Sequence, residues 1–378
     1  MVSIGPLHRG DVNMQEFEMQ KEIYLHDYLL RGLGSPPEQT LKACVEIVNS
    51  SISRIKTCYA ELKTYTDIQL ATMMVIDCCF ILEFLHKMPS LEQLFVLCIT
   101  VDLMLLENQI PFFVLQDIFE STRSESIQST FLIGKLLELR KYIDPFRGDI
   151  SNNNVGTFTT HDHILGLLHK SYNLASESED LVTFQESPTP HTAIELHRAG
   201  VNFKLNQDEN WLMAMKYEPS LFLCFYRPWG KPTLRMPKLY IEDSTERVLR
   251  NFIAYEQSPL TQVHHYFTSY ATAMDMLVDV QEDIEKLVES EVVDNDLGSN
   301  EEAAKMINDI CKEVCVIEFF YCQQWEELDS YYKGYWPKNI AWLRRTYFNS
   351  PWNIIALLAG IILFALTVVQ TVFTIKAT

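Results

Sequence analysis

The segment that most constrains the fold covers residues 101–119 and reads VDLMLLENQIPFFVLQDIF. Apolar residues recur on every side of its helical projection, so we expect it to be buried on most sides. Pro111 cannot donate to the carbonyl oxygen of Glu107, and it disfavours helical geometry at Ile110. The segment therefore predicts a buried helix–kink–helix in which polar side chains satisfy the freed backbone groups.

Six polar or charged side chains within apolar stretches form a candidate polar core: Lys21, Asp77, Glu83, Asp102, Glu107 and Asn108. Asp77 and Glu83 interrupt residues 70–85, which are otherwise apolar on every side. Sixteen residues with two acids are too short and too charged to span a membrane, so this stretch predicts a central core helix. Lys21 lies in the apolar stripe of a predicted helix over residues 14–30, where a lysine snorkels or pairs with a carboxylate.

The acids of this core allow two interpretations. Asp77, Glu83, Asp102 and Glu107 could together form the buried carboxylate or metal site of an enzyme. Alternatively, each acid accepts hydrogen bonds from backbone donors or from Lys21, which is the commoner situation for buried acids. We favour the second interpretation and assign no catalytic, cofactor-binding or metal-binding residue.

Residues 1–175 predict an N-terminal helical core. Further helical patterns cover residues 38–63, 131–144 and 161–175. His161, Asp162 and His163 are consecutive, and three such neighbours rarely converge on one metal, so we expect a helix cap there. Residues 176–192 are rich in Ser, Pro and acids and predict an exposed linker.

Residues 193–349 predict a small antiparallel sheet and a helical hairpin, packed on the same core. Apolar and polar residues alternate on both sides of Ala199-Gly200, which indicates a β-hairpin. Residues 221–226 and 239–241 are further strand candidates because they are short apolar runs.

Two long helices are expected after this sheet. Apolar residues repeat in heptads from Phe267 to Val288, and Ser299 with Glu302 predicts a capping box that opens the second helix. We expect the two helices to pack as an antiparallel hairpin. Three cysteines on the second helix are spaced to share one face: Cys311, Cys315 and Cys322. Zinc binding and lipidation are alternatives there, but cysteine is commonly buried, so we expect a core-facing stripe.

Residues 354–375 contain no charged side chain over 22 positions, which is long enough to cross a bilayer. Ser350 is a suitable N-cap and Pro351 a suitable first helical residue. We predict a single transmembrane anchor over residues 350–376, with these anchoring residues: Ile354, Leu357, Gly360, Leu363, Leu366, Val369 and Ile375. The expected membrane-interface residues are Lys338, Trp342, Arg344, Arg345 and Trp352. A buried C-terminal core helix is the alternative.

The charges around this span predict its orientation. Cations precede the span with no acid after Asp329, whereas Lys376 alone follows it. Excess positive charge stays on the cytoplasmic side, so we expect a single pass with residues 1–350 in the cytosol, at the plasma membrane or the endoplasmic reticulum. Nine cysteines agree with a reducing compartment. Three residues follow the span and no secretory signal is visible, so we expect late insertion, as a tail anchor.

Charge and motif content argue against several function classes. The formal net charge is −19, from 31 Lys and Arg against 50 Asp and Glu, which disfavours binding to nucleic acid. The chain lacks the glycine-rich phosphate-binding motifs, the nucleophile-elbow motif and the H-E-x-x-H zinc motif. Its 13 glycines are also few for chemistry that depends on tight phosphate-binding turns.

Four segments occur together in one order: IGPLHRG (residues 4–10), MVIDCCFILEFL (74–85), DLMLLENQIPFFVL (102–115) and NFIAYEQS (251–258). With the Pro-Trp start of the final span, they make the chain resemble the plant-specific family of unknown function numbered 247. The resemblance implies membrane association through a C-terminal helix, and some grass members are pollen-side determinants of self-incompatibility. No catalytic residues are established for the family, so none is carried over. Cys78 departs from the family pattern, where a glycine is common.

The sequence thus predicts a mainly α protein with a small antiparallel β-sheet insertion, a long C-terminal helical hairpin and one C-terminal transmembrane helix. We expect a membrane-anchored, non-enzymatic recognition or signalling protein that acts through protein–protein interaction, related to self-incompatibility or cell recognition. Its expected partners are the lipid bilayer and an unknown protein, without nucleic acid or a cofactor. The alternative is an enzyme with a buried carboxylate or metal site.

Overall fold

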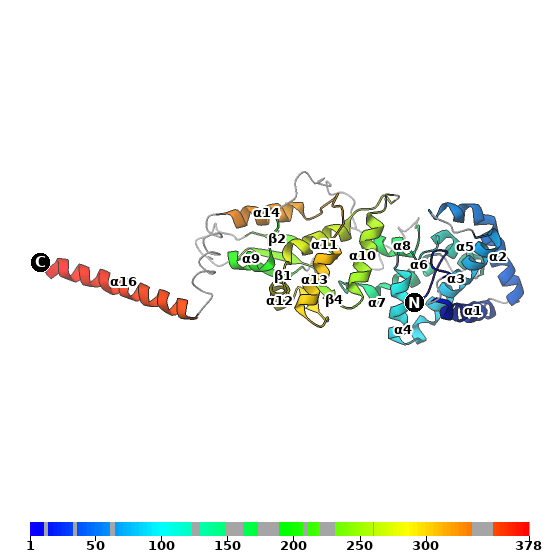
Figure 1. Cartoon of the computed structure of the whole chain (residues 1–378), viewed down its shortest axis with the longest axis horizontal. Coiled ribbons are helices and arrows are strands. Elements are labelled where there is room, and N and C mark those ends of the chain that lie inside the picture. Colours follow the sequence, from blue (N-terminus) through cyan, green and yellow to red (C-terminus); the bar gives the residue numbers. More distant parts are fainter. Residues whose placement is uncertain are drawn as a thin grey trace.

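The computed structural model describes residues 1–10, 14–32, 36–60, 65–122, 129–148, 162–172, 189–206, 211–219, 231–259, 261–334 and 351–377. Across these ranges the protein is mainly helical with small sheets, as predicted. Figure 1 shows the N-terminal helices at one end of an elongated molecule and the helix α16 at the opposite end. The strands lie between them, among the helices of the second half of the chain.

Helix α3 (Asp67–Lys87) is the centre of the N-terminal helices. It packs against α1 (Gln15–Leu30), α2 (Pro37–Thr57) and α5 (Phe112–Thr122). Because neighbours cover it on several sides, its apolar residues are distributed all round the helix rather than along one stripe. The predicted central core helix is therefore confirmed.

The segment Asp67–Ser90 consists of α3 and a short 3-10 turn, η2 (Met88–Ser90). By length and composition it is apolar enough for a membrane span. It is the one such segment among the described residues, and 78% of its most apolar window is buried inside the protein. Such burial identifies the central helix of a packed domain. Within α16, the part from Ala359 to Thr371 is a shorter apolar helix by the same measure.

Two helices flank the three adjacent polar residues of the 101–119 segment, Glu107, Asn108 and Gln109. Helix α4 (Gln93–Leu103) ends before it and α5 begins directly after Pro111. The predicted helical break is confirmed, but residues 104–111 form an irregular connection rather than a kink within one helix. The backbone N–H of Phe112 donates to the carbonyl oxygen of Asp162 at 2.9 Å, which ties the start of α5 to the next part of the chain.

Three short helices connect the two halves of the molecule: α6 (Ser129–Leu137), α7 (Arg140–Ile143) and α8 (Ile164–Lys170). The cap predicted for α8 is confirmed, because Nδ1 of His163 accepts a hydrogen bond from the backbone N–H of Gly166 at 3.1 Å. Residues 176–188 of the predicted linker lie outside the described residues. Its last residue, Thr192, is the N-cap of α9.

The predicted hairpin around Ala199-Gly200 is wrong, because its first arm is helix α9 (Ala193–Ala199). Thr192 and Glu195 form a capping box at its start, and Gly200 ends it in the left-handed conformation with φ 105°. The second arm is a strand as expected, β1 (Asn202–Leu205). The candidate strand at residues 221–226 lies outside the described residues.

The sheets are not purely antiparallel, which corrects the predicted topology. β1 pairs in parallel with β3 (Thr233–Met236), and β2 (Lys216–Glu218) pairs with β3 in the antiparallel sense. The predicted strand β4 (Leu239–Ile241) pairs in parallel with β5 (Val293–Asn295) in a second sheet. Both parallel pairs join segments that are far apart in the chain, so the strands connect separate helices.

After β4 the described chain continues with α10 (Thr245–Glu256), α11 (Tyr266–Leu277), α12 (Gln281–Glu289), α13 (Asn300–Ile310) and α14 (Cys322–Lys333). The predicted long hairpin is wrong, because the shorter helices from α11 onward take its place. The heptad stripe is buried where predicted over much of its length, but α11 ends at Leu277 and strand β5 follows α12. Ser299 caps α13 by accepting from the backbone N–H of Glu302, as expected.

The three cysteines do not share a helical face. Cys311 follows the end of α13, Cys315 is exposed, and Cys322 begins α14 and is buried. The expected core-facing stripe is therefore wrong, because the helix that would have carried it ends at Ile310.

Candidate functional site

The first residues of the chain run through the polar core of the N-terminal helices, where Val2, Ser3 and Ile4 are buried. Lys21 on α1 and Asp77 on α3 are both fully buried, and Lys21 Nζ lies 2.8 Å from Asp77 Oδ1. Lys21 also donates to the carbonyl oxygen of Ser3, and Asp77 Oδ2 accepts from the backbone N–H of Gly5 at 2.8 Å. This ion pair therefore joins two helices and the N-terminal segment.

Burial raises the pKa of the Asp77 carboxyl, and the attraction of Lys21 and Arg9 opposes that rise. The guanidinium of Arg9 lies 3.8 Å from Asp77 Oδ1, while Glu18 contacts both Arg9 and Lys21. Two cations thus face two carboxylates, which is the arrangement that keeps buried charges paired.

A second pair of polar residues holds the N-terminal backbone itself. Asp102 accepts from the backbone N–H of Val2 at 2.6 Å, and Asn108 accepts from that of Ile4 at 2.6 Å. The amide nitrogen of Asn108 donates to the carbonyl oxygens of Val2 and Asp102. Burial raises the pKa of Asp102, and the bond from Val2 opposes the rise. The prediction that Asp102 and Asn108 form hydrogen bonds with backbone groups is confirmed.

Gln109, which is not among the six residues of the predicted polar core, performs the same task at the helix break. Its side-chain nitrogen donates to the carbonyl oxygens of Leu103 and Leu105, and its side-chain oxygen accepts from the backbone N–H of Leu165. Gln109 therefore satisfies carbonyls at the end of α4 and connects them to α8.

Glu83 lies apart from this network. It is 2% exposed and pairs with Arg31 and with Lys87, whose Nζ lies 3.7 Å from Glu83 Oε1. Its charge is therefore matched by two cations of its own, one following α1 and one on α3.

Glu107 is not part of the buried core, which corrects its predicted place. Its side chain is 58% exposed and lies 3.3 Å from Nε2 of His8. In the irregular segment between α4 and α5, successive side chains do not follow a helical period, so Glu107 points outward while Asn108 and Gln109 are buried.

The acids proposed for an enzymatic site each have separate partners. Asp77 faces Lys21, Glu83 faces Arg31, and Asp102 binds backbone. Among the described residues, no group of three or more His, Cys, Asp or Glu side chains is placed to hold a metal ion. The arrangement is suited to holding the N-terminal segment in place.

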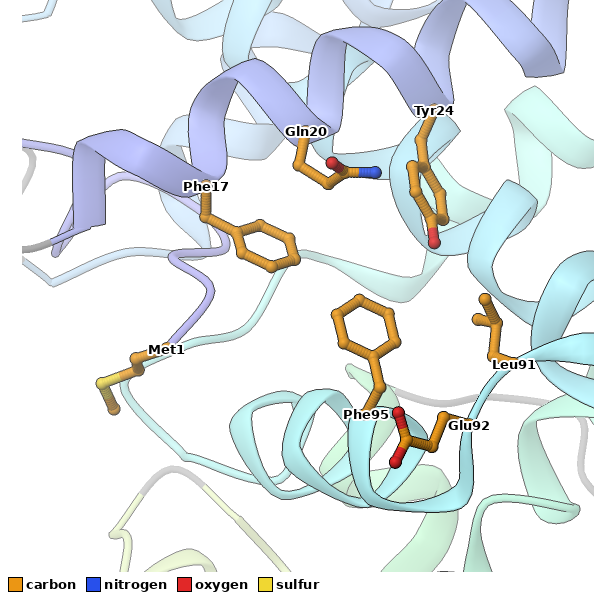
Figure 2. Close-up of a pocket in the computed structure, with 7 residues that line it drawn as sticks. All are labelled: Met1, Phe17, Gln20, Tyr24, Leu91, Glu92 and Phe95. Carbon is orange, nitrogen blue, oxygen red and sulfur yellow. The ribbon is translucent and has the colours of Figure 1, made fainter.

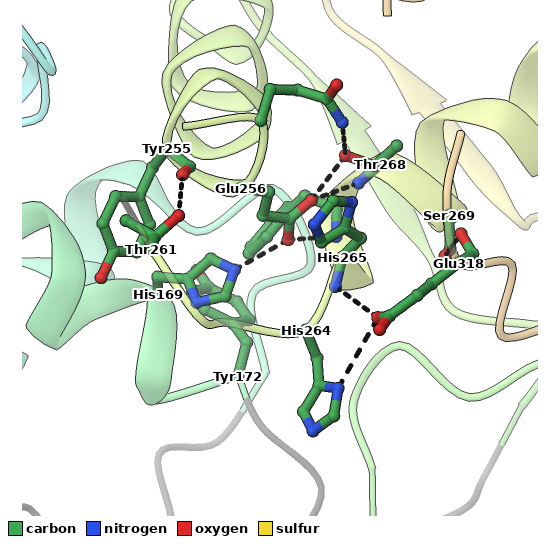
Figure 3. A network of polar contacts seen from close by, with 12 residues as sticks. His169, Tyr172, Tyr255, Glu256, Thr261, His264, His265, Thr268, Ser269 and Glu318 are labelled. Carbon is green, nitrogen blue, oxygen red and sulfur yellow. Dashed lines mark hydrogen bonds and ion pairs between the residues drawn. The ribbon is translucent and has the colours of Figure 1, made fainter. Parts of the chain in front are cut away.

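A second buried network lies in the other half of the molecule and was not foreseen from the sequence (Figure 3). Glu256, at the end of α10, is 1% exposed and accepts from the backbone N–H groups of Phe267 and Thr268 at 2.8 and 2.7 Å. Its Oε1 also lies 2.7 Å from Nε2 of His169 on α8. The carboxylate therefore caps the N-terminus of α11, where the helix dipole favours a negative charge, and connects three helices.

Aromatic rings enclose His169 in this network. Tyr255 and Phe267 have ring centroids 5.3 and 5.7 Å from the His169 ring, and His169 is fully buried. A signal for Glu256 existed, since it lies within the segment NFIAYEQS that carried part of the family resemblance. Its partner His169 is 87 residues away in the chain, and no pattern of spacing relates the two.

Helix α16 (Pro351–Ala377) has 27 residues and begins at Pro351, as predicted. Its described side chains from Ala359 to Thr371 are all exposed, including Leu363 at 64% and Phe364 at 73%. Figure 1 shows the helix extending away from the rest of the molecule. Four predicted membrane-interface residues lie outside the described residues, namely Lys338, Trp342, Arg344 and Arg345, and the side-chain exposure of Trp352 is also not described.

The chain matches known proteins along almost its whole length. Residues 1–366 match the model of a family described as DUF247, plant protein of unknown function. The UPF0481 protein At3g47200 of Arabidopsis thaliana is 26% identical, over 99% of this chain and 82% of that protein. The putative UPF0481 protein At3g02645 of Arabidopsis thaliana is 25% identical, over 98% of this chain and 85% of that protein. No solved structure matches the chain.

Proposed function

We propose that this chain, which belongs to the DUF247 family of plant proteins of unknown function, is a membrane-anchored, non-enzymatic protein that acts through protein–protein contacts. The physical features of the chain itself support this proposal. The observation that supports the anchor is the exposure of α16. Eight large apolar side chains on this helix are exposed by 46% or more: Ile355, Ile361, Ile362, Leu363, Phe364, Leu366, Val368 and Val369.

A helix that is apolar all round and exposed all round is costly in water. Each large apolar side chain loses about 1.5–3 kcal/mol when it is left in water rather than buried, so a solvated α16 is strongly disfavoured. A bilayer removes that cost, and 27 helical residues at 1.5 Å each reach about 40 Å, more than the ~30 Å hydrocarbon core. Insertion into a lipid bilayer is therefore the state that we propose for α16.

The proposed orientation places the body of the protein in the cytosol. Lys333, Lys338, Arg344 and Arg345 precede α16 without an intervening acid, and cations near a span favour the cytoplasmic side. These cations stand out because the net charge of the chain is −19. A local basic cluster on an acidic protein is suited to the anionic cytoplasmic surface of a membrane.

Contact with a partner protein is the proposed task of the body. The polar residues that were candidates for catalysis are used to hold backbone and to pair charges, which supports a binding role over the alternative of a carboxylate or metal enzyme. Recognition at a cell membrane, including the self-incompatibility role implied by the family resemblance, is the kind of function that such a protein would serve.

Alkaline carbonate extraction of the full-length protein from plant-cell membranes tests the anchor. We expect the protein to remain in the membrane pellet after alkaline carbonate extraction, and the variant Leu363→Arg/Val369→Arg to move to the supernatant, since each arginine near a span centre costs about 2.5–3.5 kcal/mol. Leu363→Ala/Val369→Ala is the matched control and should stay in the pellet. Release of the unmodified protein by carbonate would overturn the anchor.

The orientation is tested by protease protection of sealed vesicles, with an epitope at the N-terminus. We expect the epitope to be digested without detergent, because a cytosolic body is accessible to the added protease. Survival of the epitope until detergent is added would place the body on the other side of the membrane. Asn49, in its N-x-S sequon, would then be accessible to the lumenal glycosylation enzymes.

A further inference from the structure

A pocket of about 550 Å³ lies between α1 and the start of α4 (Figure 2). On one side Phe17, Gln20 and Tyr24 project from successive turns of α1. On the other side Leu91, Glu92 and Phe95 come from the turn before α4 and its first residues. A pocket of this size is sufficient for a long side chain of a partner protein.

The walls of the pocket are aromatic and are supported by the core. The rings of Phe17 and Phe95 stack with centroids 6.4 Å apart and an interplanar angle of 21°. The fully buried ring of Phe80 lies behind them, 5.7 Å from Phe17 and 5.2 Å from Tyr24. Because α3 carries Phe80 in the centre of the bundle, these walls are held in place before any ligand arrives.

The polar groups of the pocket are an acid and an amide. Glu92 is exposed and forms no ion pair or hydrogen bond through its side chain with the described residues. Although it precedes α4, its carboxylate does not cap the helix. Figure 2 shows the amide of Gln20 directed into the space between the two walls. The pocket thus offers an amide group and one carboxylate that pairs with no cation among the described residues.

Tyr24 shows that the aromatic wall already accepts a cation. Lys87 Nζ lies 4.6 Å from the centroid of the Tyr24 ring, in the range of a cation–π contact. Lys87 also pairs with Asp27 and Glu83, so two carboxylates already match its charge. No ion pair joins Glu92 to a described residue, so its negative charge is open to a cation of a partner protein.

We propose that this pocket binds an arginine side chain of a partner protein, which deepens the proposed function and rests on it. The guanidinium group is planar, so it stacks on aromatic faces, and its N–H groups form two parallel bonds to a carboxylate such as Glu92. The apolar stem of arginine is suited to the contact with Leu91 and Phe95. The net charge of −19 would attract a basic partner at long range.

Other ligand classes meet the same groups less well. An anion would be repelled by Glu92, the one charged side chain among the residues that line the pocket. A purely apolar group would cover the rings but would desolvate the Glu92 carboxylate without replacing its lost hydrogen bonds. A cation with an apolar stem satisfies both the rings and the charge.

The test uses the full chain in detergent micelles and two synthetic probes of nearly equal shape. 4-Phenylbutylguanidinium carries the arginine head group, and 4-phenylbutylurea is its neutral counterpart. Ligand-observed NMR titration should show saturable binding of the guanidinium probe, at least tenfold tighter than binding of the urea. Glu92→Gln should abolish that difference, whereas Glu285→Gln, at an exposed acid on α12, should preserve it.

A second variant separates loss of binding from loss of folding. Phe95→Leu keeps an apolar residue on α4 and should weaken the guanidinium probe several-fold while the thermal melt stays close to that of the unmodified protein. Equal affinity for both probes, unchanged affinity in Glu92→Gln, or no saturable binding would each overturn the pocket assignment. None of these results changes the carbonate extraction of α16, so failure of this site and failure of the proposed anchor are distinguishable.

Discussion

Lys21 Nζ lies 2.8 Å from Asp77 Oδ1, and both side chains have no exposure to solvent. The pair stands where α1, α3 and the N-terminal segment meet, since Lys21 also donates to Ser3 and Asp77 also accepts from Gly5. A fully buried charge without a partner is far more costly than a matched pair. The three elements are therefore held together by groups that cannot be removed one at a time without a large loss of stability.

We accordingly expect Lys21→Met to reduce the free energy of unfolding by about 3–5 kcal/mol, because it leaves Asp77 without its nearest cation. The control is Lys42→Met, which removes an exposed lysine that is 3.8 Å from Glu46 on the surface of α2 and should change stability by less than about 0.5 kcal/mol. Chemical denaturation followed by tryptophan fluorescence measures both. Adding Asp77→Asn to Lys21→Met should recover part of the loss, since asparagine still accepts from Gly5 and carries no charge. An equal loss in the double variant would refute the role of the unpaired charge.

Asn108 and Glu107 are neighbours with opposite environments, so they form a matched pair of substitutions. Asn108→Leu leaves the backbone N–H of Ile4 and two carbonyl oxygens without a partner, and we expect it to cost about 2–4 kcal/mol. Glu107→Leu removes an exposed contact with His8 and should cost less than about 1 kcal/mol. Thermal melts of the two variants measure both losses of stability. A larger loss for Glu107→Leu than for Asn108→Leu would contradict the observed orientation of this segment.

The sequence predicted the helical core well because its signals are periodic. α1, α3 and the break at Pro111 follow from apolar spacing and from the missing N–H of proline. The outward position of Glu107 could not be predicted, because irregular backbone gives adjacent side chains no fixed relation. The pairing of His169 with Glu256 was equally inaccessible, since it depends on how α8 and α10 pack.

The wrong predictions in the second half of the chain have a different origin. There the sequence contained the correct local signals for helix ends, but the alternation of apolar and polar residues was given more weight. Thr192 and Glu195 form a capping box, and Gly200 follows the last helical residue, yet the short alternation of apolar residues suggested a hairpin. The heptad stripe from Phe267 to Val288 correctly marked buried positions. It could not show that α11 ends at Leu277 and that a strand follows α12.

Gly5 occupies a position that only glycine suits. Its φ is 75°, and a Cβ atom there would lie 2.7 Å from the carbonyl oxygen of Gln109. We expect Gly5→Ala to destabilise the protein by about 2 kcal/mol or more, from backbone strain and displacement of the N-terminal segment. Gly134→Ala is the matched control, since a Cβ there meets nothing within 4 Å and alanine is the better helix former, so a gain of about 0.5–1 kcal/mol is expected. Equal effects of the two substitutions in a thermal melt would show that the close approach at Gly5 is tolerated.

His163 should make stability depend on pH between about 4 and 6.5. Burial lowers the pKa of His163 to about 4, against the opposing effect of Asp162. The unfolded chain binds a proton below about pH 6.5 whereas the folded protein resists protonation down to about pH 4, so stability is complete above pH 6.5 and falls as the pH decreases through this window. The loss should be about 2 kcal/mol, less than the full pKa difference implies because His163 is partly exposed.

The replacement His163→Asn isolates this effect. Asparagine can still accept from the backbone N–H of Gly166 and cap α8, but it does not titrate. Denaturation midpoints measured at pH 4.5, 5.5 and 7.0 should therefore vary less in His163→Asn than in the unmodified protein, by roughly the 2 kcal/mol assigned to the histidine. Other acids of the chain contribute equally to both proteins, so the difference between the two curves reports His163 alone. Parallel curves over the whole range would show that this imidazole is protonated as readily in the folded protein as in the unfolded chain.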